Sequence, residues 1–234
     1  MLKMAVSRWI CSRLEIGSKT KIKRPYTKQR EEEHNMKRFI KIIAVCLTLT
    51  IPVSSSAATW TIDPDHSNVG FKVRHLMVSN VKGSFEKHNG TVDINDKDIT
   101  KSKVEVSIDT NSINTNVQKR DEHLRSADFL DVAKYPAMTF VSRIIAKVGK
   151  DKLKVTGDLT LHGVTKTVVL DVEDLSEESK DPWGNIRKGA TATTKINRKD
   201  FGLLWNAALE TGGVVVGEEI TITLEIEMIK VQPK

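Results

Sequence analysis

Histidine is the residue type in this sequence best suited to chemistry near neutral pH, because its imidazole can exchange a proton or bind a metal ion. Residues 59–234 contain five of them: His66, His75, His88, His123 and His162. No pair has the His-x-His or His-x-x-x-His spacing that commonly places two ligands on one strand or helix face. His66 and His75 are an odd number of residues apart, so on one strand they would face opposite ways. We therefore expect no metal site, with a zinc or copper site assembled from distant histidines as the alternative.

Groups for nucleophilic or acid–base catalysis are equally sparse. Both cysteines, Cys11 and Cys46, precede residue 59, and the G-x-S-x-G motif of a serine nucleophile is missing from the sequence. Asp63 and Asp65 lie beside His66 in the segment DPDHS, which is more typical of a turn than of a catalytic group. In RKDFG, residues 198–202, we expect Arg198 to pair with a nearby carboxylate at a charged corner. The sequence thus predicts no catalytic residue.

One histidine occupies an unusual position in a strand pattern. From Asn68 onward apolar and polar residues alternate, which is typical of a half-buried strand, and Val69, Phe71 and Val73 share its apolar face. His75 falls on the same face. A buried imidazole needs a partner, and a neighbouring protein group or the polar head of a bound ligand would each supply one.

The positive charge of the chain is concentrated at its start. Residues 1–58 hold 12 of the 37 Lys and Arg residues but only 4 of the 30 Asp and Glu residues, so residues 59–234 carry a formal charge of −1. This near-neutral balance argues against a nucleic-acid partner. Residues 36–58, MKRFIKIIAVCLTLTIPVSSSAA, have the layout of a signal peptide cleaved after Ala58, and we interpret residues 1–35 as a non-native upstream extension. Residues 59–234 then form one exported domain.

Alternating apolar rows dominate residues 59–234. They occur at residues 92–94, 104–108, 138–144, 153–161, 164–172, 190–196 and 220–228, and His162-Gly163 suits a tight turn between two of them. Gly157 lies inside a row, which often marks a bend or a close backbone approach. Residues 116–131 break the pattern and predict a short helix with Leu124 on its buried side. Long strands with one apolar face and only one or two short helices to cover them predict an all-β fold, which we expect to be a closed antiparallel β-barrel.

The inward rows consist mainly of Val, Ile, Leu and Ala, with few aromatic residues. Such side chains do not readily fill a wide barrel, and a barrel with room to spare can hold a ligand. The sequence therefore favours an interior suited to an elongated apolar molecule.

Four segments carry a family resemblance. DPDHSNVGFKVRH, RDEHLRSADFLDVAKYPAMTF (residues 120–140), GDLTLHGVTKTVVL (residues 157–170) and NRKDFG (residues 197–202) occur in the order seen in the YceI-like family of polyisoprenoid-binding proteins. The resemblance extends from Trp60 to about Ile229. It implies a lipocalin-like barrel that encloses a long apolar tunnel with a helix against one opening. It also implies export to the periplasm and a bound long-chain isoprenoid lipid.

On this basis we expect a non-enzymatic protein that binds, transports or stores a polyisoprenoid of the quinone or prenyl phosphate type, with no cofactor besides that lipid. Transient contact with a membrane or membrane protein, and a homodimer, are the further partners considered. We expect His75, and with it Arg74 or Arg120, near the lipid head group. The expected tunnel wall comprises Phe71, Val73, Phe140, Leu159, Leu161, Ile222 and Leu224.

Two alternatives remain at this point. An enzyme acting on an isoprenoid or a small apolar substrate would use His75 or His123 together with an adjacent carboxylate. A stress-linked interaction protein would have a solid barrel and bind its partner on the outside.

Overall fold

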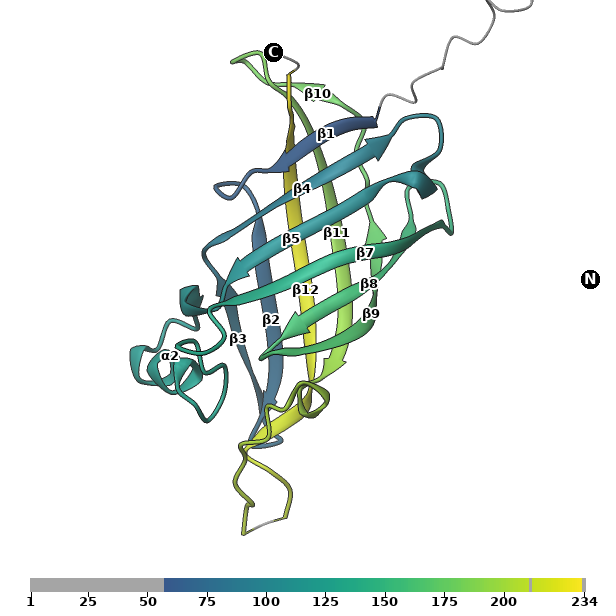
Figure 1. Cartoon of the computed structure of the whole chain (residues 1–234). Helices are drawn as coiled ribbons and strands as arrows, with labels where there is room; N and C mark the ends of the chain where they lie inside the picture. The colour runs from purple at the N-terminus through teal and green to yellow at the C-terminus, as the bar shows by residue number, and fades with distance from the viewer. Residues whose placement is uncertain (1–56, 211, 233–234) are drawn as a thin grey trace, which may run out of the picture. The chain divides into compact units, whose positions relative to one another are not determined.

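A computed structural model describes residues 57–210 and 212–232, in which strands predominate (Figure 1). The strands are β1 (Ala57–Ile62), β2 (Asn68–His75), β3 (Ser79–Phe85), β4 (His88–Asn95), β5 (Lys103–Asp109), β6 (Ile113–Asn114), β7 (Ala137–Lys147), β8 (Leu153–Leu161), β9 (Val164–Glu173), β10 (Ser179–Lys180), β11 (Ile186–Asn197) and β12 (Val216–Lys230). The expected upstream extension and signal peptide lie outside the described residues, apart from Ala57 and Ala58. These two alanines begin β1 and pair with Asn95 and Ile94 of β4.

Eight strands form a closed antiparallel ring in the order β1-β4-β5-β7-β8-β9-β11-β12. The ring closes through β12, which pairs with β11 from Arg187↔Ile229 to Asn197↔Glu219 and with β1 at Trp60↔Lys230. Closure gives the edge strands partners, as the long alternating rows predicted. The expectation of a closed antiparallel barrel is confirmed.

β12 also pairs with a second set of strands, which extends the wall of the barrel. Beyond its contact with β1, β12 pairs with β2 from Val216↔His75 to Glu225↔Asn68. β2 pairs in turn with β3, and β3 with the short strand β6. β1 and β2 thus follow one another along one side of β12, joined by the turn that contains DPDHS (Figure 1).

The predicted helix is present but shorter than expected. α2 spans Gln118–Arg125, whereas the sequence predicted a helix over residues 116–131. The backbone N–H of Ser126 bonds to the carbonyl of His123, and residues 127–135 continue as turns and coil. Leu124 is partly buried and reaches the barrel interior. Three 3-10 turns complete the helical content of the described residues: η1 (Ile99–Lys101), η2 (Thr110–Ser112) and η3 (Arg198–Phe201).

The turn between β8 and β9 has the geometry that its sequence indicated. His162 and Gly163 both have positive φ angles, 51° and 74°, and Leu161 pairs with Val164 across the turn. Two consecutive residues with positive φ are characteristic of type I′ hairpin turns, whose twist matches that of the strands. This predicted hairpin is confirmed.

Strand alternation places the apolar rows inside the barrel. In β8 the inward positions Leu153, Val155, Gly157, Leu159 and Leu161 are all buried, while the residues between them are exposed or partly exposed. The largest core cluster joins such rows from most of the ring strands. A smaller cluster of Trp60, Ile62, Ile94 and Met228 packs where β1 meets β12. The interior is therefore predominantly apolar.

Candidate functional site: an apolar cavity inside the barrel

The inward rows do not meet in the middle of the barrel. They leave a cavity of about 270 Å³, which we call the barrel cavity, and its volume is just below the range of about 300–1,000 Å³ that is usual for small-molecule sites. Its lining comes from strands all round the ring, together with Leu124 of α2 and Phe129 and Leu130 that follow it. The seven side chains expected in a tunnel wall are all part of this lining: Phe71, Val73, Phe140, Leu159, Leu161, Ile222 and Leu224. Contact between them and a lipid stays a prediction.

Polar side chains are rare in the lining of the barrel cavity. Among its described residues they are His88, Ser102, Thr194 and Arg198. The hydroxyl oxygen of Ser102 accepts a hydrogen bond from the backbone N–H of Asn95, so it already has a partner. A cavity with so few polar groups favours a ligand that is hydrocarbon over most of its length.

The three residues expected near a lipid head group lie elsewhere. His75 is half-buried at the end of β2, where it pairs with Ser79 and Val216, and it is not among the residues that line the barrel cavity. Arg74 is exposed and its Nη2 donates to the carbonyl of Met77, 2.8 Å away. Both residues therefore belong to the β2–β3 hairpin, and a role in binding a head group stays a prediction.

Arg120 has an architectural contact. Its Nε donates to the hydroxyl oxygen of Thr115 at 2.7 Å and its Nη2 to the Thr115 carbonyl at 2.9 Å. The buried carboxylate of Asp121 accepts from the backbone N–H and the hydroxyl of the same threonine. These bonds tie the first turn of α2 to the segment after β6. Arg120 also does not line the barrel cavity.

Arg198 departs from the sequence prediction. The expected corner ion pair is wrong, because the side chain is 2% exposed and has no carboxylate within ion-pair distance among the residues described. Its Nε, Nη1 and Nη2 donate to the backbone carbonyls of Gly217, Leu203 and Val216 at 2.9, 2.5 and 3.3 Å. Burial lowers the pKa of this guanidinium. Arg198 joins η3, the following loop and the start of β12 at one end of the barrel cavity.

His88 is a cavity residue that the sequence reasoning did not single out. It opens β4, and its Nδ1 lies 3.4 Å from the Phe85 carbonyl, while its Nε2 is buried without a hydrogen-bond partner among the described groups. Strand alternation could have identified it, because His88, Gly90, Val92 and Ile94 share one face of a row that was otherwise recognised as apolar.

His123 does have the neighbouring carboxylate that an enzymatic alternative requires. Its Nε2 lies 2.9 Å from Asp128 Oδ2, on the solvent side of α2. The ring also packs edge-on against Phe129 and Trp205, with centroid distances of 5.0 and 4.9 Å. This imidazole is not part of the lining of the barrel cavity. The His123–Asp128 pair thus joins α2 to the turn that follows it, and the ring contact with Trp205 joins α2 to the loop after η3, both outside the cavity.

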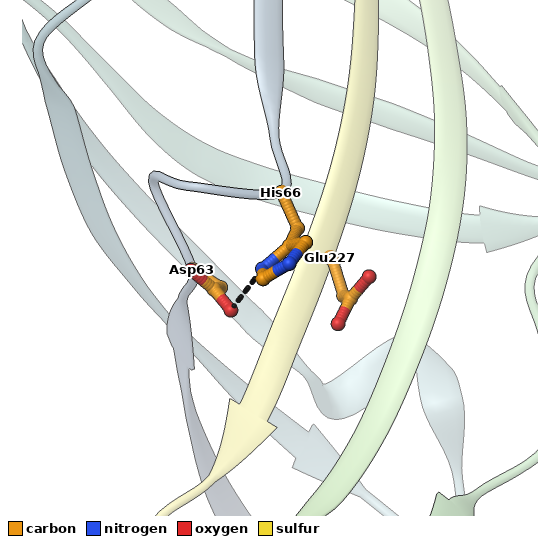
Figure 2. A group of neighbouring side chains, drawn as sticks. All are labelled: Asp63, His66 and Glu227. Carbon is orange, nitrogen blue, oxygen red and sulfur yellow. Dashed lines mark hydrogen bonds and ion pairs between the residues drawn. The ribbon is translucent and has the colours of Figure 1, made fainter. Parts of the chain in front are cut away.

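Figure 2 shows a separate polar group at the turn between β1 and β2, made of Asp63, His66 and Glu227. One potential ligand atom from each lies within 4.8 Å of the others, which would suit a metal ion. Arg187, however, donates through Nη1 to Asp63 at 2.6 Å and to Glu227 at 2.5 Å, and through Nε to Asp181 at 2.7 Å. A protein cation therefore already binds these carboxylates, and the arrangement fits an ion-pair network that fastens the turn to β11 and β12.

The network shifts the ionisation of its members. Burial raises the pKa of Asp63, but hydrogen bonds from Arg187 and His66 outweigh burial and hold this pKa below its ordinary value. Asp181 behaves in the same way, with Arg187 and Asn185 as its main donors. The hydrogen bond to Asp63 raises the pKa of His66. The segment DPDHS is thus a turn, as expected, and its acidic and basic groups stabilise one another.

None of the helices in residues 57–210 and 212–232 has the length and apolar character needed to span a bilayer.

Comparison with known proteins agrees with the barrel. A protein named YceI from Salmonella newport is 42% identical over 174 residues, which cover 74% of this chain and 88% of that protein. The crystal structure of a Campylobacter jejuni YceI protein matches with a TM-score of 0.59 and 35% identity, covering 73% of this chain and 96% of that one. A polyisoprenoid binding domain from Saccharophagus degradans, implicated in plant cell wall breakdown, has the same fold, with a TM-score of 0.54 and 19% identity over 74% of this chain and 98% of that one.

The match to a family is direct. The family model described as the YceI-like domain covers residues 60–228, which include at least part of every strand of the ring and omit only the start of β1 and the end of β12. The four sequence segments that first indicated the resemblance form defined parts of this barrel. They are the turn after β1 together with β2, the stretch from α2 to β7, the β8–β9 hairpin, and η3. The chain therefore belongs to the YceI-like domain family.

Proposed function

We propose that this protein is a non-enzymatic carrier or store for a long-chain polyisoprenoid lipid of the quinone or prenyl phosphate type. The lipid tail occupies the barrel cavity, and the protein works in the periplasm after export directed by residues 36–58. The observation that carries the proposal is the barrel cavity itself, about 270 Å³ in volume and almost entirely apolar. A solid barrel, which one alternative required, would have no such cavity.

Hydrophobic burial is sufficient to hold such a ligand. Each CH₂ group removed from water contributes about 0.8 kcal/mol, so a chain of about ten carbons contributes about 8 kcal/mol. The loss of translational and rotational freedom on association costs about 4–15 kcal/mol. A longer isoprenoid tail therefore binds without any charged contact.

The family comparison supports the same ligand class. The related domain from Saccharophagus degradans is described as polyisoprenoid binding, and it shares the barrel fold. Fold alone does not determine a ligand, but here an apolar interior accompanies the shared fold.

The test is to express the full chain in its native host, purify it without detergent, extract it with organic solvent and analyse the extract by mass spectrometry. We expect an isoprenoid lipid in near-stoichiometric amount. Protein that folds, remains soluble and yields no lipid would contradict the proposal. N-terminal sequencing of the purified protein tests the export step, for which we expect a start at Thr59.

A further inference from the structure

The tip of the β2–β3 hairpin exposes three consecutive apolar side chains. Leu76, Met77 and Val78 are 39%, 49% and 75% exposed. They follow the last residue of β2 directly and precede Ser79, the first residue of β3. Three adjacent large apolar residues at a loop tip are unusual for a surface turn, which polar residues and glycine normally occupy.

The backbone of this tip makes the choice of residues more unusual. Leu76 and Met77 have φ angles of 50° and 59°, and the N–H of Val78 bonds to the carbonyl of His75 at 3.1 Å, as in a type I′ turn. This conformation favours Asn-Gly, since side chains with a large Cβ substituent are strained at positive φ. The turn therefore keeps apolar residues at a conformational cost, and such local strain in a structure points to a function.

The sides of the hairpin carry only positive charge. Residues 72–82, KVRHLMVSNVK, include Lys72, Arg74 and Lys82 and no acidic residue. All three basic side chains are exposed, and Lys72 lies directly opposite Lys82 in the strand register. Like charges facing one another across two strands destabilise a sheet unless a counter-charge is near.

Acidic groups on the neighbouring strand do not supply that counter-charge. Glu218 of β12 is paired with Lys199 at 2.5 Å, and Glu219 with Lys195 at 2.8 Å. In the described part of the loop packed against the hairpin tip, the acidic residue is Glu210. The hairpin thus presents a basic flank beside an apolar tip.

This hairpin stands beside one end of the barrel cavity. Val73, two residues before the end of β2, lines the cavity, and so does Val216, which pairs with His75. The tip also contacts the loop before β12, because the N–H of Leu76 donates to the Val215 carbonyl at 2.8 Å. A lipid that enters or leaves near this end passes close to the hairpin.

We propose that the β2–β3 hairpin docks this end of the barrel on an anionic lipid bilayer. Leu76, Met77 and Val78 enter the head-group region, while Lys72, Arg74 and Lys82 contact lipid phosphates. The purpose of docking rests on the proposed function, because docking would allow the lipid to exchange between the bilayer and the barrel cavity. We choose a bilayer as the partner because the positions of the apolar and basic residues match its layers. The apolar tip of the hairpin would reach the apolar layer, and the basic residues behind the tip would lie level with the negatively charged phosphates.

The experiment measures cosedimentation of the purified protein with vesicles of equal parts phosphatidylglycerol and phosphatidylcholine, and with vesicles of phosphatidylcholine alone. We expect stronger binding to the anionic vesicles, weakening as salt is added. Each basic residue near an anionic surface contributes about 1 kcal/mol, so the Lys72→Gln/Lys82→Gln double variant should bind about 30-fold more weakly.

A second variant separates docking from folding. Leu76→Asn/Met77→Gly installs the pair that the turn prefers, so it should raise the urea midpoint of unfolding while lowering binding to anionic vesicles by about tenfold. Val148→Ser removes an exposed valine outside the hairpin and serves as the matched control, with binding expected to stay unchanged. Unchanged vesicle binding of both hairpin variants would overturn the proposal, as would equal binding of wild type to both kinds of vesicle.

The lipid content of each variant distinguishes this proposal from the proposed function. Hairpin variants that lose vesicle binding but still contain extractable isoprenoid agree with both the docking proposal and the carrier function. We expect such variants to acquire the lipid more slowly than wild type. Hairpin variants that bind vesicles as well as wild type contradict the docking proposal but leave the proposed carrier function intact. Wild-type protein that binds vesicles through the hairpin but never contains lipid contradicts the proposed carrier function but leaves the docking proposal intact.

Discussion

The ring of Phe140 on β7 covers Gly157 on the neighbouring strand β8. A Cβ at Gly157 would lie 2.5 Å from Phe140 Cζ and 2.6 Å from the Val141 carbonyl oxygen, closer than such atoms approach. The absence of a side chain at Gly157 therefore lets the aromatic ring lie along the inner wall, where it lines the barrel cavity. The close approach that the sequence suggested for this glycine is confirmed.

We expect Gly157→Ala to displace the Phe140 ring and to lower the free energy of unfolding by about 1–3 kcal/mol, the usual effect of overpacking. Gly189→Ala on β11 is the control, since its new Cβ would meet the Ile226 carbonyl oxygen at an ordinary 3.5 Å. Urea denaturation of the two variants measures the difference. Equal midpoints would show that the ring can move aside freely.

The barrel cavity can be filled from inside. Ala192 on β11 is buried and lines the cavity, and Thr193 beside it is exposed. Ala192→Phe should reduce the lipid recovered by solvent extraction several-fold, whereas Thr193→Phe, which adds similar bulk on the outside, should leave it unchanged. Circular dichroism confirms that both variants fold. Undiminished lipid in folded Ala192→Phe would place the ligand outside the cavity.

Arg187 is expected to stabilise the fold in a pH-dependent way. Asp63 and Asp181 have lowered pKa values in the folded state, so their contribution is present above their ordinary pKa, 3.8, and is lost as the pH falls through the folded values. Arg187→Met removes the donor that both carboxylates share and leaves them almost buried without it. Its urea midpoint should therefore fall far below that of wild type at neutral pH, and the two should converge in acid.

Lys195→Met is the control for Arg187→Met, because the Lys195–Glu219 pair is largely exposed on both sides. Its midpoint should stay near that of wild type at every pH. A loss in Arg187→Met that is equally large at acid and neutral pH would contradict the ion-pair explanation.

His66 has the opposite pH dependence. Its pKa is raised above the ordinary 6.5 by Asp63, so its contribution is fully present below that pH and is lost as the pH rises through the folded pKa. His66→Gln should therefore lower the urea midpoint near pH 5.5 and have less effect near pH 8.5. Two-dimensional NMR of the imidazole measures the pKa directly, and a value at or below 6.5 would refute the interpretation.

Arg198 should matter for stability even though no described carboxylate lies within ion-pair distance of its guanidinium. Arg198→Met removes the side-chain donor from the carbonyls of Leu203 and Gly217, whereas the Val216 carbonyl still accepts from Asn206 Nδ2 at 2.7 Å. Each buried carbonyl left unpaired costs about 1–3 kcal/mol. Thermal unfolding should show a large decrease in Tm. Lys199→Met, which breaks the exposed pair between Lys199 and Glu218, should change Tm little, and equal effects of the two substitutions would count against this role.

Local patterns predicted much of this fold. Alternation alone assigns the inward row of β8, and His162-Gly163 identifies its turn, because both depend on residues close together in sequence. The barrel follows from the number of such rows and the shortage of helices to cover them. The pattern predicts a helix over residues 116–131, whereas α2 ends at Arg125, where the N–H of Ser126 bonds to the His123 carbonyl and turns follow.

The environment of single polar residues could not be predicted in the same way. Arg198 satisfies its donors with carbonyls of a loop and of β12, so its burial depends on how distant segments meet. His75 shares the apolar face of β2 but lies where that strand ends, while His88 reaches the cavity from β4. A face can be read from alternation, but its position along the barrel requires the register of neighbouring strands.

The pairing of β12 has a consequence for assembly of the barrel. β12 is the partner of β1, β2 and β11, and all three precede it in sequence. The ring therefore cannot close, and β1 and β11 each keep an unpaired edge, until residues 216–230 are available for pairing. Closure of the barrel therefore requires the last strand. A polypeptide that ended before β12 would expose unpaired edge strands, which can pair with other chains and aggregate, and would not enclose a cavity.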